Sequence, residues 1–254
     1  MISLKKSNKP VLKISNLSKD YYDTSGEIEA LKNINLVVYP NEWISIIGPS
    51  GCGKTTILSI LSNLEDKTEG TIELDKDIKI GYMLQKDALY PWLTVLDNCL
   101  LGLKINNTLT KDNKEKVLNM LKEYGLKDFI DKYPNSLSGG MRQRVALIRT
   151  LATGANLLLL DEPFSAIDFQ TRHFLSDDIY EIVQKEKVTV ILVTHNIEEA
   201  LILSDRVIVL SNRPATIKKI YDINYEDRSI PSENRKCKEF SNYYDSIWRD
   251  LDVS

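Results

Sequence analysis

Residues 48–56, GPSGCGKTT, have the residue types and the spacing of a loop that binds nucleotide phosphates. Three glycines in the loop permit positive φ angles, so backbone N–H groups can turn inward around an anion. Lys54 can reach the β- and γ-phosphates, and the hydroxyl of Thr55 can bind Mg²⁺. The loop therefore predicts a nucleotide site, and it requires a buried strand before it and a helix after it.

Two neighbouring carboxylates, Asp161 and Glu162, follow the apolar run LLLL at 157–160. Successive side chains of a strand point to opposite sides, so these two acids can face different targets. Asp161 suits Mg²⁺ together with Thr55. Glu162 is then available to orient or deprotonate an attacking water. The pair supplies the second half of a site for phosphoryl transfer.

A further anion site is predicted where LSGGMRQR, residues 137–144, opens a helix. Ser138, Gly139 and Gly140 leave N–H groups exposed at the positive end of the helix dipole. One nucleotide does not need two helix N-termini from the same subunit. We therefore expect this turn to serve the nucleotide of a partner, in a dimer with the nucleotide at the interface.

Buried strands must position these residues. Four short apolar runs are typical of parallel strands covered on both faces: 43–47, 157–160, 189–193 and 207–210. Helical spacing over 55–64, 171–186 and 196–204 alternates with them, which predicts an α/β fold. The alternating segments VLKISNLSKDYY and IEALKNINLVVY predict an antiparallel side sheet, and residues 86–150 form a helical insertion.

The chain divides by pattern into a main domain, residues 1–220, and a polar tail, residues 221–254. Phe240, Tyr244, Ile247, Trp248 and Leu251 recur in the tail at helical spacing. We expect a helix packed on the surface of the domain. A helix that binds a partner remains the alternative.

Charge, hydropathy and cysteine content give no support to several classes of protein. The net charge of −3 gives no reason to expect nucleic-acid binding. The polar N-terminus is not typical of a secretory signal, and no apolar stretch approaches the length that crosses a bilayer. Three widely spaced cysteines, at 52, 99 and 237, indicate a reducing compartment without a disulfide framework or a zinc site.

Nearly the whole chain, residues 10–215, resembles the ATPase subunits of ATP-binding cassette (ABC) transporters. GPSGCGKTT resembles their Walker A motif, LLLLDE their Walker B motif and LSGGMRQR their signature motif. Met141 stands where many members of the family have Gln. The resemblance implies a phosphate-loop ATPase core with a parallel sheet, an antiparallel side sheet and a helical subdomain. It implies ATP and Mg²⁺ as cofactors.

The resemblance also assigns roles to isolated positions. It implies that Gln85 senses the metal site and joins Thr55 and Asp161 around it, and that His195 contacts the γ-phosphate. Asp168, in SAID at 165–168, is similar to the residue that crosses the dimer interface. Catalysis is assigned to Lys54, Gln85, Glu162 and His195. Nucleotide contacts are assigned to Tyr21, Gly48, Pro49, Ser50, Gly51, Cys52, Gly53, Lys54, Thr55, Thr56, Ser138, Gly139, Gly140 and Asp168.

Some of these positions have alternatives. Tyr21 is expected to stack on adenine, with Tyr22 as its substitute. Asn196 follows His195 where importers usually carry Asp, which can alter the hydrogen bonding around the histidine. His173 is expected to be structural.

The segment DALYPWLTVLDN, residues 87–98, is similar to the branch that imports nitrate, sulfonates and taurine, as is LSNRPATI at 210–217. Leu89, Tyr90, Trp92 and Leu93 form either a socket for a permease helix or part of the core. The predicted protein is an importer motor on the cytoplasmic face of the membrane. Its expected partners are a second copy of itself, arranged head to tail, permease subunits and, indirectly, an extracytoplasmic solute-binding protein.

Three other classes compete with this prediction. An exporter cassette is the nearest alternative, and a different segment after Gln85 would favour it. Soluble ABC proteins usually carry two cassettes or a long coiled-coil insertion. A metabolic kinase or a GTPase would not account for the LSGG sequence.

Overall fold

Two β-sheets and the helices around them make up the fold of this computed structural model, which describes residues 9–23, 26–165 and 167–252. The polar start of the chain and Ala166 of the SAID sequence, both used above, lie outside these residues. In the described chain the larger sheet has six strands in the order β5-β6-β7-β3-β8-β9. The strands are β3 (Trp43–Ile47), β5 (Ile80–Met83), β6 (Leu157–Asp161), β7 (Thr189–Val193), β8 (Arg206–Leu210) and β9 (Ile217–Asp222).

The predicted parallel strands are confirmed, because β5, β6, β7, β3 and β8 all pair in parallel. Every residue of β3, β6 and β7 is buried. Leu158 and Leu160 pack into one core cluster, whereas Leu157 and Leu159 pack into the cluster on the opposite face. Burial on both faces accounts for unbroken apolar runs. Strand β9, which was not predicted, adds an antiparallel edge to β8.

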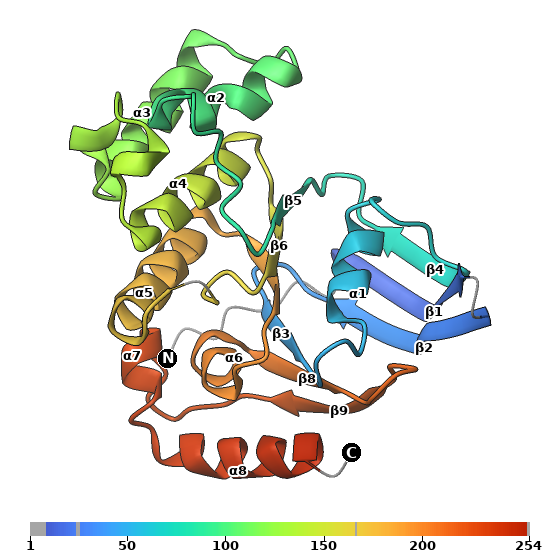
Figure 1. Cartoon of the computed structure of the whole chain (residues 1–254). Coiled ribbons are helices and arrows are strands. Elements are labelled where there is room, and N and C mark those ends of the chain that lie inside the picture. The colour runs from blue at the N-terminus through green and yellow to red at the C-terminus, as the bar shows by residue number, and fades with distance from the viewer. Residues whose placement is uncertain (1–8, 24–25, 166, 253–254) are drawn as a thin grey trace.

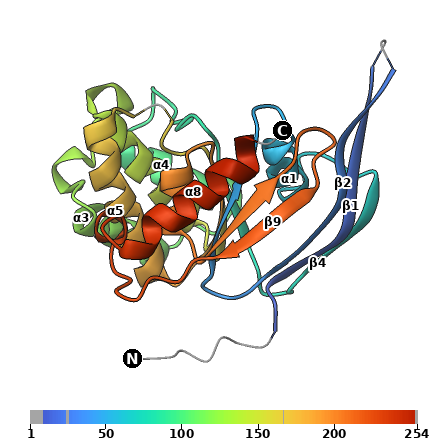
Figure 2. The same cartoon turned by 90° about the horizontal axis from the view of Figure 1, so that it is seen from below.

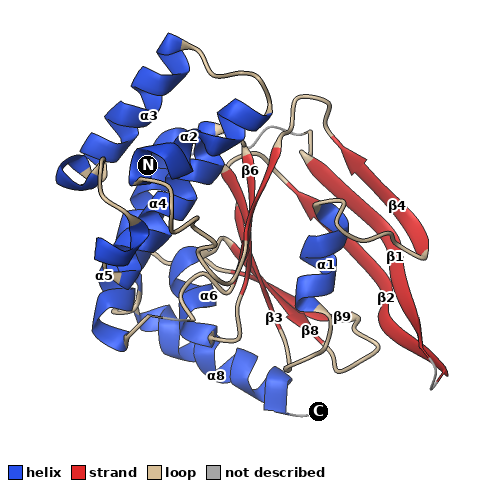
Figure 3. Ribbon diagram, turned by 45° about the horizontal axis from the view of Figure 1, so that its top comes forward, coloured by secondary structure: helices blue, strands red, loops and turns tan. Residues whose placement is uncertain are grey.

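The smaller sheet is antiparallel, as predicted, with the order β2-β1-β4. It contains β1 (Leu12–Asp23), β2 (Gly26–Val38) and β4 (Glu69–Leu74). Helix α1 (Lys54–Leu61) lies between the two sheets (Figure 3). Its buried side carries Ile57, Leu58 and Leu61, which pack into the same core cluster as β1 and β2.

The insertion between β5 and β6 is helical, as expected, and projects from one end of the molecule (Figure 1). It contains α2 (Val95–Ile105), α3 (Lys111–Glu123) and α4 (Gly139–Ala152), with two short 3₁₀ turns before α4. Val145 and Ile148 of α4 are fully buried in the cluster that continues into the sheet. This shared core holds α4 against the main body.

The remaining helices are α5 (Phe169–Glu186), α6 (Ile197–Leu203), α7 (Pro231–Asn234) and α8 (Lys238–Asp252). Figure 2 shows α8 lying across the outer face of the molecule. Ile247 of α8 is fully buried and shares a core cluster with α6 and with Val207 and Val209 of β8. No helix within the described residues is long and apolar enough to span a bilayer.

Candidate functional site

The phosphate-binding loop connects β3, which ends at Ile47, to α1, which begins at Lys54. Gly51 and Gly53 have positive φ angles of 73° and 119°. Gly53 also lies close to β2, since a Cβ there would stand 2.8 Å from the Leu31 Cδ2 atom. Both the backbone conformation and the lack of space therefore require glycine at this position.

Lys54 is 7% exposed, and its ammonium group lies over the loop. The Nζ atom donates to the carbonyl oxygens of Gly48 at 2.8 Å and of Pro49 at 2.9 Å. These two hydrogen bonds provide the buried ammonium group of Lys54 with polar partners from the backbone. They place the charge of Lys54 within the loop that was predicted to hold phosphates.

Asp161 ends β6 and faces α1. Its Oδ1 atom accepts a hydrogen bond from the Thr55 hydroxyl at 3.3 Å, and its Oδ2 atom accepts one from Tyr82 Oη at 3.2 Å. Burial raises the pKa of Asp161, although these two bonds and the charge of Lys54 act in the opposite direction. Burial and the neighbouring carboxylate raise the pKa of Tyr82 to about 12. Asp161 and Thr55 thus present hard oxygen atoms side by side, which fits the ligand preference of Mg²⁺.

Glu162 follows Asp161 and has a φ angle of 45°, which is uncommon for a residue with a side chain. Its Oε2 atom accepts a hydrogen bond from Gln85 Nε2 at 3.2 Å, and its Oε1 atom lies 3.2 Å from His195 Nδ1. The three residues come just after β5, β6 and β7, which are neighbours in the sheet. Because β5, β6 and β7 pair in parallel, their carboxyl ends lie side by side and bring the three side chains together.

A cavity of about 650 Å³ lies between these groups and the phosphate-binding loop. Nine of its ten lining residues were predicted as site residues. The lining residues are Ser50, Gly51, Gly53, Lys54, Thr55, Thr56, Gln85, Glu162, His195 and Arg213. A cavity of this size falls in the range of small-molecule sites.

Arg213 is the lining residue that sequence reasoning missed. It lies in the connection between β8 and β9, and its Nη2 atom donates to the carbonyl oxygen of Gly51 at 2.6 Å. Arg213 belongs to LSNRPATI, a segment that indicated only the branch of the family. The available signal was a cation beside Pro214 in a loop that leaves the carboxyl end of β8.

The two candidate adenine-stacking residues lie in different surroundings. Tyr21 is half-buried, and its hydroxyl donates to the carboxylate of Glu65 and lies 3.4 Å from Thr56 Oγ1. Tyr22 is 73% exposed and donates to Glu27 at 3.0 Å. Consecutive side chains of β1 alternate between the two faces of the sheet, and the contact with Thr56 places Tyr21 on the side of the phosphate-binding loop.

Ser138, Gly139, Gly140 and Asp168 do not line the cavity. Ser138 is the N-cap of α4, where its hydroxyl accepts from the Met141 N–H at 3.3 Å. Asp168 is the N-cap of α5 and accepts from the Thr171 N–H at 3.0 Å. Both side chains are on exposed residues. Within one chain, these residues therefore remain separate from the nucleotide cavity.

The segment after Gln85 is tied to α4 by two arginines that sequence reasoning did not select. Arg142 Nε donates to the carboxylate of Asp87 at 2.9 Å. Arg149 donates to the carbonyl oxygens of Asp87 and Ala88, both at 2.7 Å. These contacts connect the approach to the cavity directly to the helix that begins with the SGG turn.

Four apolar or aromatic residues follow in this segment. Leu89 is buried, whereas Tyr90 is 42% exposed and Trp92 is 69% exposed. The rings of Tyr90 and Trp92 lie 5.2 Å apart. Leu93 is half-buried. His173 lies elsewhere, on α5, where its Nε2 atom is 2.9 Å from Arg235 Nη1.

A comparison with family models matches residues 31–165, more than half of the chain, to the ABC transporter family. The chain belongs to this ABC family. It is an ABC ATP-binding subunit, an enzyme that hydrolyses ATP, and its fold agrees with that of solved cassettes. The dimeric structure of the ATP-binding cassette MJ0796 in a post-hydrolysis state with ADP and Pi is 32% identical, with a TM-score of 0.69 over 84% of this chain and 99% of that one.

Curated ABC relatives cover most of the chain. The uncharacterized ABC transporter ATP-binding protein YtlC of Bacillus subtilis is 42% identical over 94% of this chain and 95% of its own length. The uncharacterized protein MJ0412 of Methanocaldococcus jannaschii is 47% identical over 85% and 83%. The nitrate import protein NrtD of Synechocystis is 37% identical over 93% of each chain. Import proteins for aliphatic sulfonates and taurine also match, at 37% and 36% identity.

Proposed function

We propose that this ABC ATPase is the motor of an importer for nitrate, sulfonates, taurine or a related small solute. The names of the nitrate, sulfonate and taurine import relatives support the branch. One observation supports the ATPase site most strongly. Gln85 and His195 both contact Glu162 beside the phosphate-binding loop. Each of these residues comes from a different strand end.

In this proposal residues 48–56 bind the phosphates of ATP through backbone N–H groups, and Lys54 exchanges its two carbonyl partners for phosphate oxygens. The Thr55 hydroxyl, Asp161 and Gln85 would hold Mg²⁺, which supplies charge neutralisation at the β- and γ-phosphates when bound. The closeness of the Thr55 and Asp161 oxygens, 3.3 Å, supports this assignment. Tyr21 stacks on the adenine.

Glu162 orients and deprotonates the attacking water. Its carboxylate is held from both sides by Gln85 and His195, which limits its motion and fixes its direction. His195 then contacts the γ-phosphate, where it stabilises the charge that develops during transfer. Hydrolysis needs positioning and charge stabilisation more than covalent chemistry.

Two copies close head to tail, and each contributes Ser138, Gly139, Gly140 and Asp168 to the nucleotide of the other. The separation of these residues from the cavity within one chain supports a shared site. ATP favours the closed dimer because it contacts both halves, and loss of the γ-phosphate removes this preference.

Each cassette docks on a permease subunit at the cytoplasmic face of the membrane. The exposed rings of Tyr90 and Trp92 support a docking surface in the segment after Gln85. A solute-binding protein outside the membrane delivers the solute to the permease.

Glu162→Gln tests the proposed catalytic site. The amide cannot accept the proton of water, so turnover falls about 1,000-fold while ATP binding persists. Gel filtration with Mg-ATP then shows a trapped dimer. A variant with near wild-type turnover would remove Glu162 from catalysis. The importer assignment is tested separately, by co-purifying the permease and the binding protein and measuring the affinity of the binding protein for nitrate, sulfonates and taurine.

A further inference from the structure

Helix α6 begins two residues after His195. At its other end, the backbone carbonyl groups accept hydrogen bonds from residues of the C-terminal segment. A helix leaves its last four carbonyl groups without partners inside the helix. In α6 the Ala200 carbonyl accepts from the Ser204 N–H at 3.2 Å. The next three carbonyls accept from side chains of the C-terminal segment: Leu201 from Tyr225 Oη at 3.2 Å, Ile202 from Asn234 Nδ2 at 2.9 Å and Leu203 from Arg228 Nη2 at 3.4 Å.

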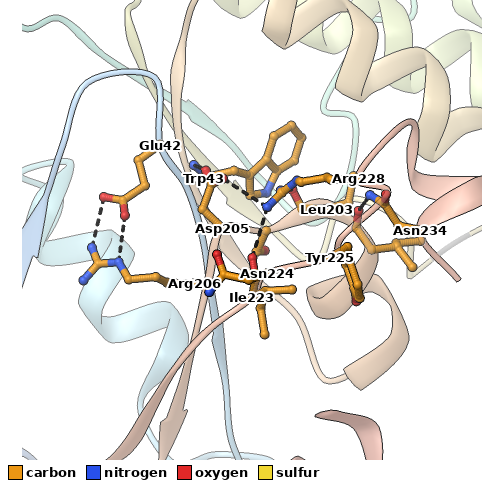
Figure 4. Close-up of polar contacts among 12 residues, drawn as sticks. Glu42, Trp43, Leu203, Asp205, Arg206, Ile223, Asn224, Tyr225, Arg228 and Asn234 are labelled. Atoms are coloured by element: carbon orange, nitrogen blue, oxygen red, sulfur yellow. Dashed lines mark hydrogen bonds and ion pairs between the residues drawn. The ribbon is translucent and has the colours of Figure 1, made fainter. Parts of the chain in front are cut away.

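Two of these three donors are themselves held by further contacts. Asn234 is fully buried, and its Oδ1 atom accepts from the Ser229 N–H at 2.8 Å. Arg228 forms an ion pair with Asp205 at 3.1 Å, and Asp205 Oδ2 accepts from the Trp43 N–H at 2.8 Å (Figure 4). Arg228 therefore connects the end of α6 to the start of β3, the strand that leads to the phosphate-binding loop.

The C-terminal segment also contacts the first turn of α6. Arg235 forms an ion pair with Glu198. Asn196, the N-cap, accepts from the Glu198 and Glu199 N–H groups at 2.9 and 3.3 Å, so the residue next to His195 is rigidly joined to the helix. Tyr244 and Trp248 of α8 line a cavity of about 340 Å³ with His195, Asn196 and Ile197. Both ends of α6 are thus held by residues beyond 222.

We propose that the C-terminal segment, residues 223–252, positions His195 for ATP hydrolysis by fixing helix α6. Tyr225, Arg228 and Asn234 act as positioning residues, since none of them lines the nucleotide cavity. A shift of α6 moves Asn196 and therefore His195, which is held 3.2 Å from Glu162. This inference rests on the proposed role of His195 and extends it to the tail.

Tyr225→Phe tests the inference with the smallest change, because it removes only the hydroxyl that bonds Leu201. We expect kcat to fall about fivefold, the effect of one lost hydrogen bond on the barrier. The dissociation constant for ATP stays within about twofold, because the phosphate-binding loop and Tyr21 are untouched. Tyr124→Phe is the matched control. It removes a half-buried hydroxyl bonded to Glu186, away from α6, and leaves kcat unchanged.

A double-mutant cycle with His195→Ala distinguishes an effect that acts through His195 from a general loss of structure. If the segment acts through His195, Tyr225→Phe has no further effect on kcat once the imidazole is absent. An equal loss in the presence and absence of His195 would overturn the inference, as would an unchanged kcat for Tyr225→Phe. If His195→Ala itself kept wild-type turnover, the proposed role of the histidine would fail, and the positioning role would fail with it.

Asn234→Asp provides a second variant, since it replaces the donor to Ile202 by an acceptor of the same size. Circular dichroism and nucleotide affinity report whether the chain is folded. The inference requires kcat to fall more than for Tyr225→Phe, with the same dependence on His195. A folded variant with normal kcat would contradict it.

Discussion

The two predicted anion sites of this chain are built very differently. Around the phosphate-binding loop, side chains from three neighbouring strand ends already contact one another, and Lys54 and Asp161 are buried. At the SGG turn, Ser138 is exposed, and its hydroxyl accepts from the Met141 N–H at the start of its own helix. The first region is organised within one chain, whereas the second presents a helix N-terminus outward. This difference predicts that mutations can separate nucleotide binding from dimer assembly.

The strongest test of this comparison is Ser138→Arg. A bulky cation at the exposed turn blocks the approach of a second copy without touching the cavity of its own chain. We expect turnover to fall about 1,000-fold and ATP-dependent dimerisation to disappear. The affinity of the monomer for ATP stays unchanged. Ser241→Arg adds the same charge at an exposed position on α8 and serves as the control. Normal dimerisation of Ser138→Arg under ATP would contradict a shared site.

Asp161→Asn tests the site around the phosphate-binding loop. Loss of the carboxylate is expected to lower turnover about 100-fold, since Mg²⁺ would lose a ligand. Asp178→Asn is the matched change. Burial also raises the pKa of Asp178, but this residue lies on α5 and not at the cavity, so the variant should keep its activity.

Asp161→Asn should also raise the melting temperature of the nucleotide-free protein by about 2 °C. Burial raises the pKa of Asp161 above its ordinary value of 3.8, so its ionised form is disfavoured in the folded state. The stability that protonated Asp161 gives to the folded state is present below pH 3.8. It is lost as the pH rises through the pKa that Asp161 has in the folded protein. The gain for Asn is therefore expected at neutral pH and should vanish at low pH. A gain that persisted unchanged at pH 3 would rule out this cause.

The smallest effect is expected at Tyr21, the proposed adenine contact. Tyr21→Ala should weaken ATP binding about tenfold, which is the typical value of one aromatic stack on a base. Tyr22→Ala, the matched change on the opposite face of β1, should have no effect. Isothermal titration with both variants compares them directly. Equal losses, or a larger loss for Tyr22→Ala, would reassign the adenine contact.

Local pattern predicted most of the fold. The runs at 43–47 and 189–193 are fully buried strands because they are continuous and β-branched. Strands β4 and β9 were missed, since all of their residues are exposed or half-buried and no apolar run marks them. Their positions depend on pairing with β1 and β8, partners distant in sequence. Arg213 was missed for the same reason, because its contact with Gly51 joins residues 162 positions apart.

The phosphate-binding loop could be predicted without the structure, because glycine spacing fixes a local backbone conformation that needs no distant partner. The sequence also predicted Asp161 and Glu162 as acids at a strand end. The contacts themselves depend on the tertiary structure, which joins Gln85 and His195 to Glu162 and turns Tyr21 rather than Tyr22 toward Thr56. The order β5-β6-β7 is set by long-range hydrogen bonding and by burial on both faces of the sheet, and spacing along a chain does not encode which strands become neighbours.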